Sequence, residues 1–304
     1  MKKLSSNFIN LVREIYNNES PIVLHRPYFD EDEKKSLLNC IDSNFVSSAG
    51  PEISQFEKEI SRITGLKHVI ATVNGTSALH LAMHELGLSE DNEVITQALT
   101  FVATANAISY TGAKPVFLDV DLDTYGLSPE ALDTFLSKCA HKTDLYPINK
   151  KTKKIIKAVV PMHTFGCPSR IKDIYDICQE WGLDLIEDCA ESLGSFSDGL
   201  HTGKLARIST LSFNGNKIIT TGGGGAVLTD DAKLANSIRH IATTAKKQHP
   251  YRYIHDQISY NYRMPNLNAV LGLAQISKLN NFLEKKRKLH TIYKDFFDSF
   301  GYKM

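Results

Sequence analysis

The sequence predicts an α/β protein in which helices cover both faces of a mostly parallel β-sheet. Two observations support this fold class. From residue 66 onward, short apolar runs alternate with helical patterns, and strands that alternate with helices favour parallel pairing. The chain also has 304 residues, 42% of them hydrophobic, which suffices for one large domain and a smaller companion.

The order of elements begins with a helix ahead of the sheet. Because Phe8, Leu11, Val12, Ile15 and Tyr16 are spaced as on one helical face, we expect an amphipathic helix that packs on the body or on a partner chain. No continuous apolar run follows the initial lysines, so this segment does not read as a signal peptide.

Seven apolar runs are expected to form the strands of the sheet, namely residues 68–73, 93–97, 114–120, 154–161, 183–188, 208–213 and 225–229. Four helices are expected among them, at residues 77–86, at 101–112, from 128 onward and at 169–181. Ser128 suits the N-cap of the third helix and Pro129 its first turn.

The pattern changes near residue 232, where the sequence becomes helical, charged and rich in tyrosine. We therefore expect an N-terminal helical extension over 1–21, a large domain over 22–231 and a smaller domain over 232–304. No apolar run approaches the length of a transmembrane helix.

Composition narrows the function classes. Lysine and arginine total 35 against 34 acidic residues, and this balance argues against a dedicated nucleic-acid binder. The basic run at 149–154 is expected to be a solvated loop. The five cysteines form no C-x-x-C pair, which indicates free thiols in a reducing compartment, and so the cytoplasm.

In parallel α/β sheets, ligands bind outside the carboxyl ends of the strands. The turn Gly75-Thr76-Ser77 follows the first strand and opens a helix, so its free N–H groups and hydroxyls suit a phosphate. The alternative is an ordinary helix cap, which is the commoner use of serine and threonine at that place.

Three more side chains follow other strands at the same edge. Asp188 could hold a protonated ring nitrogen or form a cap or salt bridge, and Phe101 could stack on a flat ring or belong to the core. Lys217 could be a nucleophile or a surface lysine in a turn. Together with the 75–77 turn, they match the needs of pyridoxal phosphate, which requires an anion site, an aromatic contact, an acid on its pyridine nitrogen and a lysine.

Six stretches then carry a specific resemblance: VNGTSALH, TFVATANAI, PVFLDVDLDTYGL, IEDCAESLGS, SFNGNKIITTGGGGAV and SYNYRMPNLNAVLG. In this order they resemble the DegT-type sugar-nucleotide aminotransferases, which are fold-type-I enzymes that use pyridoxal phosphate. The resemblance runs from about residue 22 to the end of the chain. FVSSAGP and YNYRMPN most resemble the branch that acts in legionaminic acid and bacillosamine synthesis.

The resemblance implies a role for each candidate residue. Lys217 would bond covalently to the cofactor and Asp188 would pair with its pyridine nitrogen. The phosphate would be held by Ser212 and by the turn of Gly75, Thr76 and Ser77, and Phe101 would stack on the ring. Glu191 stands where family members often have a glutamine near the cofactor's phenolic oxygen. Asn261 and Arg263 resemble a segment that reaches the neighbouring subunit's site, which implies a homodimer.

The implied reaction uses glutamate as amino donor and a nucleotide-linked 4-keto-6-deoxy sugar as acceptor, and it yields a 4-amino sugar nucleotide for a surface polysaccharide or glycan. Members of the resembled family continue through more of their small domain, so the resemblance also implies a C-terminally shortened chain with an incomplete α+β small domain. The alternative function is a truncated homologue that binds the cofactor but is catalytically silent.

Other enzyme classes fit less well. A nicotinamide-dependent oxidoreductase would carry G-x-G-x-x-G after its first strand, where this sequence has VNGTSALH. The dehydratase branch of the resembled family has a histidine in place of the lysine, and Lys217 argues against it.

Three tempting signals receive no functional assignment, and no metal site is expected. Asp119, Asp121, Asp123 and Glu130 imitate part of a calcium loop, but the glycine of its sharp turn is missing. His80 and His84 lack the glutamate of a zinc-protease motif and are expected to pack or to be solvated. His163 follows a strand at the same edge, and whether it lines the pocket stays open.

Overall fold

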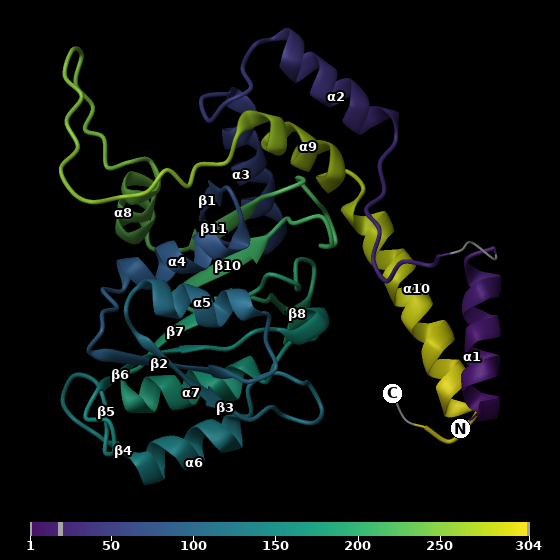
Figure 1. The fold of residues 1–304 in the computed structure, drawn as a ribbon, viewed down its shortest axis with the longest axis horizontal. Helices are drawn as coiled ribbons and strands as arrows, with labels where there is room; N and C mark the ends of the chain where they lie inside the picture. Colours follow the sequence, from purple (N-terminus) through teal and green to yellow (C-terminus); the bar gives the residue numbers. More distant parts are fainter. Residues whose placement is uncertain (1, 18–20, 303–304) are drawn as a thin grey trace.

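The computed structural model describes residues 2–17 and 21–302, and its main feature is a nine-stranded sheet (Figure 1). Seven strands follow the order β1-β11-β10-β7-β6-β2-β3. Their bounds are β1 (His68–Thr72), β2 (Asn92–Gln97), β3 (Lys114–Leu118), β6 (Ile155–Val160), β7 (Asp184–Asp188), β10 (Ile208–Ser212) and β11 (Gly225–Thr229). The short strands β4 (Ala140–His141) and β5 (Ile148–Asn149) extend the sheet beside β6, and β8 (Phe196–Ser197) and β9 (Leu200–His201) form a separate hairpin.

The pairing confirms a mostly parallel sheet. The five strands β10, β7, β6, β2 and β3 pair in parallel, whereas β11 is antiparallel to both of its neighbours, β1 and β10. All seven strands expected from the sequence are present, with ends shifted by at most two residues.

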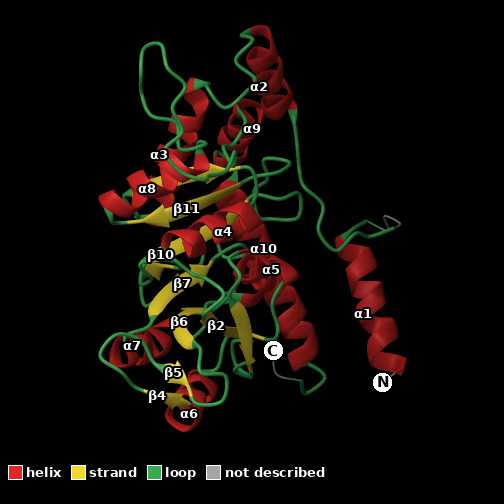
Figure 2. Ribbon diagram, turned by 60° about the vertical axis from the view of Figure 1, so that its left-hand side comes forward, coloured by secondary structure: helices red, strands yellow, loops and turns green. Residues whose placement is uncertain are grey.

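Helices cover both faces of the sheet because its strands alternate two apolar faces (Figure 2). Val94 and Ile186 belong to one buried cluster with α4 (Gly75–Glu85), α5 (Val102–Tyr110) and α8 (Ala232–Ala242). Their chain neighbours Ile95 and Leu185 belong to another cluster with α6 (Pro129–Cys139) and α7 (Ile171–Trp181). The prediction of a sheet covered on both faces is therefore confirmed.

Two helices escaped the sequence prediction, α2 (Glu31–Asp42) and α3 (Pro51–Thr64). Their signals were nevertheless present. Asp30 and Glu33 form a capping box at the start of α2, and α3 begins with a proline and ends at Gly65 in the left-handed conformation. The helix α3 matters for the site because it packs under β1 and against α9 (Asn266–Ile276).

The region after residue 231 contributes α8, α9 and α10 (Leu279–Asp298), together with isolated bridges such as Thr243 with Asn261. Both α8 and α9 pack on elements of the preceding region, α8 on α4 and β1, and α9 on α2 and α3. The division of the chain at residues 21 and 231 stays a prediction.

The expected N-terminal helix is present as α1 (Lys2–Ile15), and it lies beside α10 at one side of the molecule (Figure 1). Phe8 makes the contact, with its ring centroid 5.1–5.5 Å from those of Tyr293, Phe296 and Phe297. The amphipathic face of α1 therefore packs within the same chain. Across the described ranges, every helix is too short or too polar to cross a bilayer.

Candidate active site

Lys217 lies in the loop that connects β10 to β11, and its side chain is mostly buried. Its Nζ is 3.2 Å from Glu191 Oε1, and only 13% of the side chain is exposed. The base of the loop is closed by hydrogen bonds, because the Phe213 amide donates to the Gly224 carbonyl and the Thr221 amide to the Phe213 carbonyl. The lysine is thus presented inward by a fixed loop and is not a surface residue of a plain turn.

Asp188 ends β7 with only 2% of its surface exposed. The Thr104 hydroxyl donates to Oδ2 over 2.8 Å, and the Ala190 amide donates to Oδ1 over 3.1 Å. Burial raises the pKa of this carboxyl, while those two hydrogen bonds and the charge of Lys217 lower it. The buried acid is therefore suited to pairing with a positively charged ligand group.

Thr104 is a functional candidate that the sequence reading missed. It lies in α5, one turn after Phe101, and its hydroxyl is also 2.8 Å from that of Thr100. The sequence signal for Thr104 was its position one helical turn after Phe101, the aromatic residue that follows a strand. Phe101 itself precedes α5 with 67% of its surface exposed, so the alternative that it belongs to the core is wrong.

The turn after β1 meets the end of β10. A Cβ on Gly75 would lie only 2.8 Å from Ser212 Cβ, so glycine permits this close approach. The helix α4 begins at Gly75 and is capped by Asn74, whose side chain accepts the Ser77 amide over 2.7 Å. This leaves the first amides of α4, those of Gly75 and Thr76, as the helix donors for an anion next to Ser212.

The structure places Ser77 differently from the other members of that turn. Its amide is used by the cap, and its surface is only 7% exposed. Asn74, which the sequence reading did not single out, is the residue that fixes the turn. Its backbone also explains Gly225, since a Cβ there would lie 2.5 Å from the Asn74 carbonyl carbon.

Glu191 is held between Lys217 and a strained loop. Its Oε2 accepts the Phe165 amide over 2.8 Å while Oε1 faces the lysine. Phe165 has a φ of +55°, which is unusual for a bulky residue, and a Cβ on the next residue, Gly166, would lie 2.7 Å from the Glu191 carbonyl oxygen. The loop at 163–167 thus fixes this carboxylate against the lysine.

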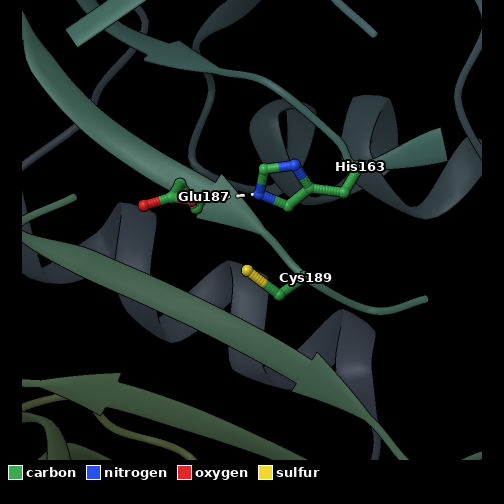
Figure 3. Close-up of side chains that lie close together, drawn as sticks. All are labelled: His163, Glu187 and Cys189. Atoms are coloured by element: carbon green, nitrogen blue, oxygen red, sulfur yellow. Dashed lines mark hydrogen bonds and ion pairs between the residues drawn. The ribbon is translucent and has the colours of Figure 1, made fainter. Parts of the chain in front are cut away.

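His163 does not line a pocket, because it is fully buried. Figure 3 shows its ring facing Glu187, with Cys189 beside them. The Ser169 amide donates to Nδ1 over 3.1 Å, so the ring proton sits on Nε2 and is donated to Glu187 Oε2 over 2.9 Å. The imidazole is therefore a neutral structural partner of Glu187.

The ligand atoms of His163, Glu187 and Cys189 lie within 4.8 Å of one another, a spacing that could hold a metal ion. Protein groups already use these atoms. Glu187 also accepts the amides of Gly203 and Ala206, over 2.7 and 2.9 Å. Burial raises the pKa of the Cys189 thiol well above its usual value, which opposes the thiolate that a metal would need. The cluster supports the end of β7, directly behind Asp188.

Asn261 and Arg263 lie beside the end of β1. Arg263 bridges to Thr72, its Nε donates to Asn261 Oδ1 over 3.3 Å, and both residues are exposed. Arg263 is therefore held beside the end of β1, and Asn261, whose backbone bridges to Thr243, is hydrogen-bonded to it.

His80 is buried as expected for a packing residue. Its ring centroid is 4.8 Å from that of Tyr260, and its Nδ1 is 3.3 Å from the Tyr262 hydroxyl. In residues 119–130, whose sequence imitates part of a calcium loop, Asp121 Oδ1 accepts the Asp123 amide over 2.7 Å. This aspartate is therefore part of a turn.

A cavity of about 430 Å³ opens beside Lys217. Its walls are the end of α1, the segment 22–28, residues 217–220 and one face of α10. Gln275 helps to hold the segment in place, because its side-chain amide donates to the Tyr28 carbonyl over 2.9 Å. This volume is in the range of small-molecule sites.

The residues fit pyridoxal phosphate. The buried Asp188 suits a protonated ring nitrogen, the glycine turn beside Ser212 suits a phosphate, and Lys217 is inward-facing and able to bond an aldehyde. One edge of the sheet brings together these three groups, which lie far apart in the sequence.

Comparisons with known proteins agree with this fit. A sequence model of the DegT/DnrJ/EryC1/StrS aminotransferase family matches residues 27–304. GDP-perosamine synthase of Escherichia coli O157:H7 is 38% identical over 273 residues, which are 90% of this chain and 70% of that protein. EpsN of Bacillus subtilis (strain 168), named as a pyridoxal phosphate-dependent aminotransferase, is 36% identical over 90% of this chain and 68% of its own. Among solved structures, Helicobacter pylori PseC, an aminotransferase of pseudoaminic acid biosynthesis, superposes with a TM-score of 0.80 at 26% identity, covering 90% of this chain and 70% of that chain.

Proposed function

Because the chain belongs to the DegT/DnrJ/EryC1/StrS aminotransferase family and is a pyridoxal phosphate-dependent sugar-nucleotide aminotransferase, we propose that it moves an amino group from glutamate to a nucleotide-linked 4-keto-6-deoxy sugar. The products would be 2-oxoglutarate and a 4-amino sugar nucleotide for a surface polysaccharide or glycan. The observation that carries the proposal is the convergence of Lys217 and the buried Asp188 beside a glycine turn that suits a phosphate.

Each residue of the site has a definite task. The amides of Gly75 and Thr76 and the Ser212 hydroxyl would bind the phosphate, and the Asp188 carboxylate would stabilise a protonated ring nitrogen. When bound, pyridoxal phosphate supplies an electron sink for the carbon that loses its proton. Lys217 carries that proton on Nζ, and Glu191 Oε1, 3.2 Å away, holds the amine in position.

The glutamate step is testable by absorption spectroscopy. The purified chain with pyridoxal phosphate is expected to show the visible band of a lysine-bound cofactor, and L-glutamate is expected to replace it with a near-ultraviolet band. D-glutamate serves as the control and should leave the visible band intact. A band that responds to another amino donor but not to L-glutamate would refute the donor assignment, and the lack of any band would refute the cofactor site.

We propose a homodimer in the cytoplasm as the working form. The loop at 246–258 projects from the body (Figure 1). It exposes apolar side chains, since Tyr251, Tyr253 and Ile258 are each more than 80% exposed. It leads into Asn261 and Arg263 at the edge of the site. Light scattering is expected to give twice the mass of one chain, and a double Tyr251→Ser, Ile258→Ser variant should shift toward monomer. A monomeric mass for the unaltered protein would contradict the proposal.

The finer assignment to legionaminic acid or bacillosamine synthesis stays a prediction. The two stretches behind it, residues 45–51 and 260–266, contact one another in the structure. The Asn266 side-chain amide donates to the Phe45 carbonyl over 2.7 Å, and its backbone amide donates to the Ser47 carbonyl.

A further inference from the structure

The cavity beside Lys217 has basic side chains on several of its walls, and we call it the basic cavity. Its lining includes His25 and Arg26 from the N-terminal segment, Lys285 and Lys286 from α10, and Lys217 itself. Among the described residues that line it there is no carboxylate. The wall formed by the end of α1 and by residues 22–26 precedes the region matched by the family model, which begins at residue 27.

The Lys286 ammonium has an imidazole nitrogen as its hydrogen-bond partner. Its Nζ lies 3.0 Å from His25 Nδ1, and His25 Nε2 lies 3.2 Å from the Lys217 carbonyl oxygen. Because a carbonyl only accepts, His25 carries its proton on Nε2 and donates it there. Its Nδ1 therefore accepts from the Lys286 ammonium, and the charge of Lys286 faces a neutral nitrogen rather than an acid.

The electrostatics of the pair agree with this reading. Burial lowers the pKa of Lys286. Burial also lowers the pKa of His25, and the charges of Lys286 and Lys217 lower it further, against the opposing effect of the Lys217 carbonyl. The two basic groups are thus held together although their burial and mutual repulsion are unfavourable. A bound anion would offset this unfavourable electrostatic free energy.

We propose that the basic cavity binds the diphosphate of the nucleotide-linked substrate, with Lys286 and His25 as its contacts and Arg26 and Lys285 adding positive charge. This assignment rests on the proposed function. On binding, Lys286 turns from the imidazole to a phosphate oxygen, and His25 takes up a proton on Nδ1 and donates it to the same group. The hydrogen bond from His25 Nε2 to the Lys217 carbonyl is kept. The bound anion is therefore held at a fixed position relative to the loop that carries the reacting lysine.

Calorimetry on the cofactor-loaded protein tests the assignment, with UDP and GDP as probes. The Lys286→Met variant, which keeps the length of the stem, is expected to weaken binding of the preferred diphosphate by about tenfold or more. Lys288→Met, on the same helix but outside the cavity lining, is the matched control and should bind like the unaltered protein. Lys286→Arg should recover part of the loss. Equal affinities for Lys286→Met and Lys288→Met would overturn the proposal.

A pH series provides a readout that general damage to the fold would not reproduce. Because the bound diphosphate favours the protonated His25, its affinity should rise as pH falls toward the ordinary histidine pKa of about 6.5. In His25→Gln, the pH dependence of UDP affinity that remains reports the titration of the phosphate alone. The additional rise in affinity that the unaltered protein shows at low pH should be absent from this variant. An identical pH profile in both proteins would overturn the role of His25.

The outcomes separate this inference from the proposed function. A Lys286-dependent diphosphate site in a protein that ignores glutamate would contradict only the proposed donor. A normal glutamate response with diphosphate binding that is indifferent to Lys286 would contradict only the subsite. Inorganic pyrophosphate should compete with the nucleotide if the diphosphate is the recognised group, and a failure to compete would show recognition of the base instead.

Discussion

Replacing Lys217 with alanine is expected to abolish the visible band of bound pyridoxal phosphate and to lower transamination by about three orders of magnitude or more. The reason is that this side chain is the inward-facing amine of the loop between β10 and β11, 13% exposed and 3.2 Å from Glu191. The measurement is the absorption spectrum together with the turnover of glutamate to 2-oxoglutarate.

The control for Lys217→Ala is Lys217→Arg. The arginine keeps a positive charge beside Glu191 but cannot bond the aldehyde, so it separates loss of the ion pair from loss of the amine. Both variants should be inactive, and the arginine variant should be the more stable of the two. Activity in either one at the level of the unaltered protein would remove Lys217 from the reaction.

Asp188→Asn is expected to lower turnover by about a hundredfold or more, because a neutral amide cannot stabilise positive charge on the ring nitrogen. The change should leave the local hydrogen bonds largely intact. Asparagine has the shape of aspartate, and its Oδ1 can still accept the Ala190 amide. Its side-chain amide can donate to the Thr104 hydroxyl, because a hydroxyl can accept as well as donate. Turnover is measured with saturating pyridoxal phosphate, so that weaker cofactor binding does not imitate the effect.

The same variant has an opposite expected effect on the stability of the cofactor-free protein. Burial raises the pKa of Asp188 in the folded state, so the folded protein binds this proton more readily than the unfolded chain. That contribution stabilises the fold below the ordinary pKa of 3.8 and is lost as pH rises through the folded value.

At neutral pH the ionised side chain therefore costs stability, and Asp188→Asn should unfold at an equal or higher temperature. Pyridoxal phosphate should raise the unfolding temperature of the unaltered protein more than that of the variant. Thermal unfolding with and without the cofactor tests both statements, and a variant that is much less stable without cofactor would show that Asp188 mainly supports the fold.

The strands of the sheet were predictable because each is a short apolar run bounded by polar turns. Their order was not, since the sequence does not state that β11 inserts between β1 and β10. The helices α2 and α3 were missed although the capping box at Asp30 and Glu33 and the proline at the start of α3 are visible in the sequence. In α3 the apolar residues Ile53, Phe56 and Ile60 are also at helical spacing, so periodicity as well as the caps could have identified this helix.

The candidate site was predictable to the extent that its residues follow strands. Lys217, Asp188 and the 75–77 turn all do, and the structure places all three at one edge of the sheet. Thr104 and Asn74 were missed because their roles depend on a partner, Asp188 for one and the Ser77 amide for the other. The contact of His25 with the Lys217 carbonyl joins residues 192 positions apart, and no local sequence pattern predicts it.

The place of β11 also has a consequence for how the protein is made. In the sheet of the described residues, β1 is an edge strand whose one neighbour is β11, and β11 is the last of the seven strands along the chain. During synthesis, β1 and the turn that follows it emerge early, but β1 has no neighbouring strand until residues 225–229 leave the ribosome and insert. The lysine emerges just before them. The strand that carries the proposed phosphate turn and the loop that carries Lys217 are therefore joined to the sheet at nearly the same moment, in the closing step of its assembly.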